Sequence, residues 1–85
     1  MPERQGARLR LEDGKLLQLD AGQAQTLYDE LWRSAVAVRG AISAAAKIRH
    51  AQASKAPAEA RVETLNAEES RAIRAALGHD NGRAP

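Results

Sequence analysis

Residues 16–32 read LLQLDAGQAQTLYDELW, in which an apolar strand passes through Asp20 into an amphipathic helix. The same pattern occurs a second time, because residues 19–32, LDAGQAQTLYDELW, align without a gap with residues 65–78, LNAEESRAIRAALG. Asn66 takes the place of Asp20, and Ala follows each of them. The chain is therefore predicted to contain two equivalent units, each a strand that leads through a cap into a helix.

Asp20 and Asn66 are favourable helix N-caps, and each has a capping-box partner three positions on, at Gln23 and Glu69. The helix after Asp20 carries apolar residues at spacings of three and four. We expect this helix to end at or before Gly40. Its apolar stripe, which should pack on the sheet, consists of Ala24, Leu27, Tyr28, Leu31, Ala35 and Val38.

A β-hairpin is predicted over residues 7–19, because leucines alternate with polar residues on both sides of Asp13 and Gly14. A two-residue turn would split these leucines between the two faces of the hairpin. A type I turn with Gly14 as a G1 bulge gathers Leu9, Leu11, Leu17 and Leu19 on one face and leaves Leu16 outside. We prefer this second register, which pairs Leu11 with Lys15, Leu9 with Leu17, and Ala7 with Leu19.

A second, alanine-rich helix is predicted from Ala41 to about Ser54. Its narrow apolar side, suited to close helix contact, is expected to consist of Ile42, Ala45, Ala46 and Ile48. The segment KAPAEA follows, and Pro57 makes it a linker because proline ends a helix.

Residues 61–65 predict a short third strand with Val62 and Thr64 on one face, and the last helix follows Asn66. We expect this helix to bury Ile73, Ala76 and Leu77 and to stop at Gly78. The fold class is thus α+β, a two-layer domain in the order β-hairpin, helix, helix, strand, helix. A single domain over residues 7–78 is expected between a flexible N-terminus, 1–6, and a disordered tail, 79–85.

The composition indicates a small domain with a thin core, since the 85 residues include no Phe, one Trp and one Tyr. No cysteine is present, so no disulfide or thiolate metal site supports the core. We therefore expect a homo-oligomer, in which a second copy buries more surface. No apolar run approaches the length of a membrane span, and a cytoplasmic protein is the expectation.

No pattern of residues indicates catalysis, a metal or a cofactor. His50 and His79 are the only histidines, too few for a zinc site that normally takes four Cys or His ligands. The acidic pairs at residues 29–30 and 68–69 are adjacent, so their carboxylates point in different directions on a helix. We expect a non-enzymatic protein with no cofactor.

A basic row on the second helix is a candidate nucleic-acid site, since cations and hydroxyls at helical spacing match a phosphate backbone. The net charge of +2 does not by itself favour nucleic acid. No aromatic residue is interleaved for base stacking, and a solvated helix face explains the same row. Its members are Arg39, Ser43, Lys47, His50 and Ser54, with Arg49 and Lys55 nearby.

Arg8 and Arg10 form a second basic strip, on the outer face of the predicted hairpin. An exposed strand that carries arginine can enter a major groove in small dimeric regulators. Protection of a sheet edge against strand addition is the alternative explanation.

Tyr28 and Trp32 are the only aromatic residues and stand one helical turn apart. Trp32 lies at the boundary of the apolar stripe, a position typical of interface anchors, although it could also close the edge of the core. With Leu16 on the outside of the hairpin, these two residues are our predicted partner interface. The leading hypothesis is a regulatory or protein-interaction module, and the alternative is a nucleic-acid-binding regulator.

Overall fold

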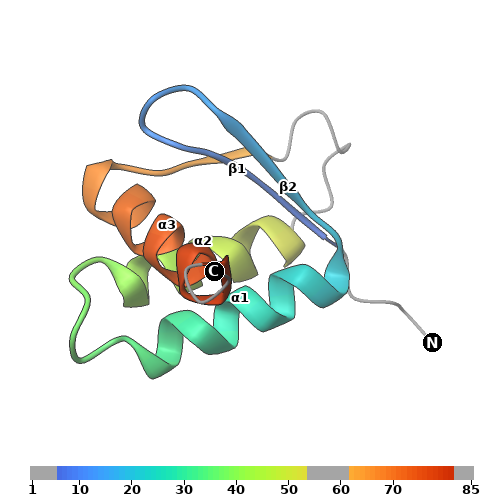
Figure 1. Ribbon diagram of the computed structural model, residues 1–85. Helices are drawn as coiled ribbons and strands as arrows, with labels where there is room; N and C mark the ends of the chain where they lie inside the picture. The colour runs from blue at the N-terminus through green and yellow to red at the C-terminus, as the bar shows by residue number, and fades with distance from the viewer. Residues whose placement is uncertain (1–5, 54–61, 82–85) are drawn as a thin grey trace.

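A computed structural model describes residues 6–53 and 62–81, with side chains as far as residue 78. It has two layers, a sheet and a group of helices beneath it (Figure 1). The α+β class and the predicted order of elements are confirmed. The elements are β1 (Ala7–Arg10), β2 (Leu16–Leu19), α1 (Ala21–Arg33), α2 (Ala41–Ala53), β3 (Val62–Thr64) and α3 (Ala67–Asn81). Residues 1–5, the linker around Pro57 and the tail from residue 82 lie outside the described residues.

The sheet has the strand order β2-β1-β3, with β1 in the centre. β1 pairs with β2 antiparallel and with β3 parallel. Between the two parallel strands the chain passes through α1 and α2, as parallel neighbours require a long crossover. Val62 and Thr64 pair with Arg8 and Arg10, so the predicted common face of Val62 and Thr64 is the outer face of the sheet.

The hairpin has the predicted G1-bulge register. Leu9 pairs with Leu17 and Ala7 with Leu19, while the Leu11 N–H donates to the Lys15 carbonyl at 2.8 Å. Gly14 has φ of 93°, the left-handed conformation that the bulge requires. The leucines of the inner face are buried or partly buried, and Leu16 lies outside.

Both helix caps form as predicted. The Gln23 N–H donates to the Asp20 carboxylate at 2.7 Å, and the Asp20 N–H donates back to the Gln23 side chain at 2.9 Å. The second box repeats this arrangement, with the Glu69 N–H donating to Asn66 at 2.8 Å and the Asn66 N–H to Glu69 at 2.9 Å. The two strand–cap–helix units are therefore real repeats of local structure.

The first helix ends seven residues before Gly40, which agrees with the prediction that it ends at or before that glycine. α1 ends at Arg33 with Ser34 as its C-cap, and a series of turns leads to α2. Of the predicted stripe, Ala24, Leu27 and Leu31 are buried, and the remainder is partly buried. The β-branched Val36, in these turns, is fully exposed.

The predicted apolar side of α2 is wrong in part, because Ile42 and Ala46 are exposed. The helix is rotated so that a stripe of alanines faces inward around Ile48: Ala41, Ala44, Ala45 and Ala51. α2 contacts α1, α3, β1 and β3. An inward stripe of small residues lets all four approach closely, and the larger Ile42 is left outside.

The last helix buries Ile73 and Ala76, with Leu77 partly buried, as predicted. Its predicted end at Gly78 is wrong, since α3 continues to Asn81. Among the described glycines, only Gly14 and Gly40 have positive φ. Gly78 therefore lacks the left-handed conformation with which glycine ends a helix.

Two glycine substitutions test this backbone. Gly40 has φ of 89°, and an added Cβ would lie 2.8 Å from the Glu68 carbonyl. We expect Gly40→Ala to lower the free energy of unfolding by about 2 kcal/mol or more, from left-handed strain and this clash. Gly78→Ala meets no atom within 4 Å and should raise it by about 0.5–1 kcal/mol, since alanine favours a helix interior. Urea denaturation measures both; equal effects, or a destabilising Gly78→Ala, would contradict this backbone.

Candidate functional site

The two aromatic residues lie on one side of α1, and one of them is half exposed. Trp32 is 49% exposed, whereas Tyr28 is partly buried against the core. Their ring centroids are 6.3 Å apart with the planes tilted by 59°. Trp32 does not close over the core in this structure, and about half of its surface is available to a partner.

Leu16 does not lie with these aromatic residues. It is 40% exposed, and strand alternation places it with Arg10 on the sheet face that points away from the helices. The structure therefore separates the predicted interface residues into two surfaces, one on the helices and one on the sheet.

Ile42, which was predicted to face the core, is exposed, and helical spacing places it on the same side of the two helices as Trp32. α1 and α2 run in opposite directions (Figure 1). The Arg49 guanidinium is 3.9 Å from the centre of the Tyr28 ring and donates to Gln25 at 3.0 Å. From Gln25, Trp32 lies two turns further along α1, and from Arg49, Ile42 lies two turns back along α2, so the register of the Gln25–Arg49 hydrogen bond places Trp32 opposite Ile42.

We call this surface the α1–α2 face and define it as Tyr28, Trp32, Ile42 and Ala46. Ile42 is 52% exposed and Ala46 is exposed as well. A signal for Ile42 was present in the sequence, because Ile42 shares a helical stripe with the charged Arg49, whereas Ile48 shares one with four alanines.

The described basic side chains of the predicted row have acceptors within the protein, and the Arg39–Glu68 pair is the longest and most exposed of these contacts. Arg39 lies 3.7 Å from Glu68, and the His50 ring nitrogen lies 2.5 Å from Glu63. Lys47 donates to Glu69 at 2.9 Å and to the Thr64 carbonyl at 2.8 Å. Arg49 bonds to Gln52 and Gln25, Ser43 donates to Gly40, and Ser54 and Lys55 lie outside the described residues. These side chains therefore connect α2 and the turn before it to α1, β3 and α3.

Glu69 is the most buried acid of this network, with a side chain 4% exposed. Burial alone would raise its pKa, but hydrogen bonds from Lys47, from the Asn66 N–H and from Ser43 outweigh burial. The pKa of Glu69 is therefore held below its ordinary value of 4.5. Next to it, the buried Ser70 hydroxyl accepts the Glu12 N–H at 2.9 Å and joins α3 to the hairpin.

The arginines of the hairpin lie on the outer face of the sheet, on the central strand. The explanation that they protect a sheet edge is wrong, because β1 has a neighbour on each side. Arg10 donates to the Gly14 carbonyl at 3.0 Å, which helps to hold the bulge. Arg8 and Arg10 share this face with Leu16, Gln18, Val62 and Thr64.

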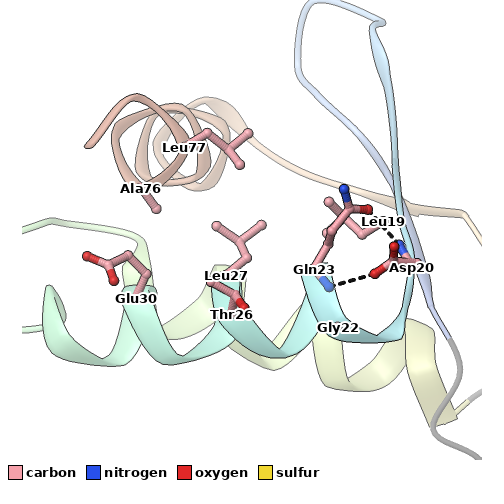
Figure 2. A pocket seen from close by; sticks show the side chains of 9 residues that line it. All are labelled: Leu19, Asp20, Gly22, Gln23, Thr26, Leu27, Glu30, Ala76 and Leu77. Carbon is pink, nitrogen blue, oxygen red and sulfur yellow. Dashed lines mark hydrogen bonds between the residues drawn. The ribbon is translucent and has the colours of Figure 1, made fainter. Parts of the chain in front are cut away.

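A cleft of about 500 Å³ lies between α1 and α3 beside the end of β2 (Figure 2). Leu27 and Leu77 point toward each other across it. The side chains that line the cleft include two carboxylates and no Lys or Arg: Leu19, Asp20, Gly22, Gln23, Thr26, Leu27, Glu30, Ala76 and Leu77. Glu30 accepts from Arg33 at 2.7 Å.

Within residues 6–53 and 62–81, no three His, Cys, Asp or Glu residues stand together as metal ligands would. In the same ranges, no helix has the length and apolar character to cross a membrane.

The pH dependence of stability tests the Lys47–Glu69 pair. Because the pKa of Glu69 is lowered by folding, its ionised carboxylate stabilises the folded protein above about pH 4.5. This stabilisation is lost as the pH falls through the folded-state pKa and the carboxylate takes up a proton. Glu69→Gln keeps a capping side chain, as Gln23 shows, but loses the charge. We expect it to cost about 1.5–3 kcal/mol at pH 7 and progressively less between pH 4.5 and pH 2. Urea denaturation across this range measures it.

Glu30→Gln is the matched control, since it removes an ion pair whose arginine is 72% exposed. It should cost less than about 1 kcal/mol at any pH. An effect of Glu69→Gln that is equal at pH 7 and at pH 2 would show that the charge of Glu69 does not stabilise the fold.

Comparison with known protein families, with curated proteins and with solved structures finds no match to this chain. The functional assignment therefore depends on three surfaces of the chain itself: the α1–α2 face, the outer sheet face with the β2 edge, and the cleft between α1 and α3.

Proposed function

We propose that this protein is a small, non-enzymatic regulatory module that binds a protein partner through the α1–α2 face. The observation that carries the proposal is the half exposure of both Trp32 and Ile42 on two adjoining helices, in the register that the Gln25–Arg49 hydrogen bond sets. Tryptophan is enriched among the residues that dominate binding energy at protein interfaces. A tryptophan beside a second exposed apolar side chain is more typical of such an interface than of a solvated helix surface.

The surroundings of Trp32 suit a binding surface that is already formed. Both helices are fixed by the core, so the face needs little ordering when a partner arrives. Ala46 is exposed on the same side of α2 as Ile42, and its small side chain lets a partner helix approach closely. The Arg49 guanidinium packs on Tyr28 and fixes one end of the face.

The charges near the face favour an acidic partner segment. The Arg33 and Arg39 side chains, on either side of the turns that join α1 and α2, are 72% and 84% exposed. Their ion pairs with Glu30 and Glu68 are on the surface, where such pairs contribute little. Both guanidiniums can therefore exchange these acids for carboxylates of a partner. We propose an amphipathic partner helix with an apolar stripe and acidic flanks.

The nucleic-acid alternative has less support. A phosphate backbone is bound by cations that exchange counterions for phosphates. Lys47 and His50 already have carboxylate partners, and Arg49 packs on Tyr28. We expect no shift of double-stranded DNA or of single-stranded RNA by this protein in gels at 50 mM salt. A shift that disappears in Lys47→Ala/Arg49→Ala would establish the alternative.

Photo-cross-linking tests the interaction. A photoreactive phenylalanine analogue at Ala46 lies on the α1–α2 face, and the same analogue at the exposed Ala75 of α3, outside that face, is the control. In extract of the native host we expect one dominant cross-linked protein from position 46 and none from position 75. Trp32→Ser should reduce that product at least tenfold, because loss of a central anchor costs 2 kcal/mol or more.

Equal labelling from both positions, or labelling from position 46 that Trp32→Ser leaves unchanged, would contradict the proposal. Trp32 also provides a direct readout, as it is the only tryptophan. Its fluorescence emission should move to shorter wavelength when the identified partner is added, because the indole leaves water.

A further inference from the structure

We propose that two copies of this chain join by pairing their β2 strands edge to edge, so that the two sheets become one. This dimer uses a different surface from the α1–α2 face and does not depend on the function proposed above. Three features of the structure point to it: the free hydrogen-bonding groups of β2, the absence of charge on that strand, and the cleft beside it.

The edge of β2 carries backbone groups that no strand of the described chain pairs with. β2 has one neighbour, β1. The Leu11 N–H bonds to Lys15 at the bulge, so the hydrogen-bonded pairs that follow are Leu9 with Leu17 and Ala7 with Leu19. In antiparallel sheets the intervening residues direct their N–H and C=O groups to the other side. Leu16 and Gln18 therefore present two donors and two acceptors along the edge.

This edge lacks the usual protection against strand addition. Edge strands of soluble proteins generally carry a charge, a proline or a bulge within the strand. β2 reads LLQL, with no charge and no proline, and Leu16 is 40% exposed. The arginines that would protect an edge are on the central strand instead, and the other edge strand, β3, carries Glu63. The unprotected edge is thus the one suited to another strand.

A second copy fits the edge in one register particularly well. With the strands antiparallel, Leu16 of each copy lies opposite Gln18 of the other, which satisfies every outward backbone group of both residues. Leu17 then meets Leu17 of the second copy at the two-fold axis, on the face toward the helices. Lys15 of one copy lies opposite Leu19 of the other, next to Asp20.

Charge complementarity identifies the second copy as the occupant. Strand alternation directs Lys15 to the same face as Leu17 and Leu19, the face toward the helices. Lys15 of the second copy would therefore point to the rim of the cleft beside Leu19, where Asp20 lies, whereas Glu30 is at the far end of the cleft and is paired with Arg33 (Figure 2). The two-fold axis repeats this contact, so each copy supplies the cation for the acidic cleft of the other.

Cysteine cross-linking tests this register, because the chain has no native cysteine. In the proposed dimer, Leu17→Cys meets its own symmetry mate in a non-hydrogen-bonded pair, with Cα atoms about 4.5 Å apart. This separation permits a disulfide. Gln18→Cys is the matched control: its symmetry mate is a diagonal neighbour, at least about 7 Å away, where a disulfide does not form without movement. We expect covalent dimer from Leu17→Cys at least tenfold faster than from Gln18→Cys.

Sedimentation equilibrium of the unmodified chain is the second measurement and needs no folded variant. A dimer is expected as the concentration rises toward the millimolar range. Lys15→Glu should raise the dissociation constant about tenfold, since two Lys–carboxylate contacts become repulsive. Trp32→Ala should leave the dissociation constant unchanged, which separates this proposal from the one about the α1–α2 face.

A monomer at all concentrations, or cross-linking of both cysteine variants at one rate, would overturn the proposal. If the chain is monomeric but a foreign extended peptide protects the amides of Leu16 and Gln18 from exchange, the edge takes a different occupant and self-pairing is excluded.

Discussion

The structure depends on the close approach of four elements to one alanine-rich helix. α2 contacts α1, α3, β1 and β3, and its inward alanines are completely or almost completely buried. Small side chains let helix and sheet backbones come together without large residues between them. This suits a chain with no Phe and few aromatics, whose fully buried large side chains are Leu9, Leu31, Ile48 and Ile73. A larger residue among these alanines would force its neighbours apart.

The central position of α2 also explains its polar side chains. α2 contacts four other elements, so several of its polar side chains lie within reach of acceptors on those elements. Lys47 reaches β3 and α3 through Thr64 and Glu69, and His50 reaches Glu63 of β3. Through these contacts, the side chains of the predicted basic row connect α2 to β3 and α3. In this arrangement no element of the described chain packs fully over Trp32 or Ile42, and about half of each side chain is exposed.

Local signals in the sequence predicted the local structure well. The two capping boxes, the G1 bulge at Gly14 and the order of strands and helices depend on residues close together in the chain, where each residue type has a clear preference. The repeat of the cap at Asp20 and Asn66 reinforced this, since two equivalent signals are less prone to error than one. The sequence also predicted that Trp32 lies at a boundary, though not which side of the boundary it occupies.

What the sequence could not predict depends on contacts between distant segments. Alanine is compatible with either side of a helix, so the rotation of α2, and with it the exposure of Ile42, was set by the packing of other elements. The place of β1 in the centre of the sheet depends on β3, which arrives much later in the chain. For the same reason Leu16 and Trp32 were predicted in one interface, although Leu16 lies on the outer face of the sheet and Trp32 on a helix. Glycine permits a helix to end but does not force it to, as Gly78 shows.

Amide hydrogen exchange tests the central role of α2 most directly. If α2 is the helix on which the other elements pack, the amides of residues 45–51 exchange only when the whole chain unfolds. Their free energies of opening then equal the free energy of unfolding measured with denaturant. Exchange from α2 through smaller openings, at lower free energy than exchange from α1 or α3, would show that the other elements hold together without it and would contradict this view of the fold.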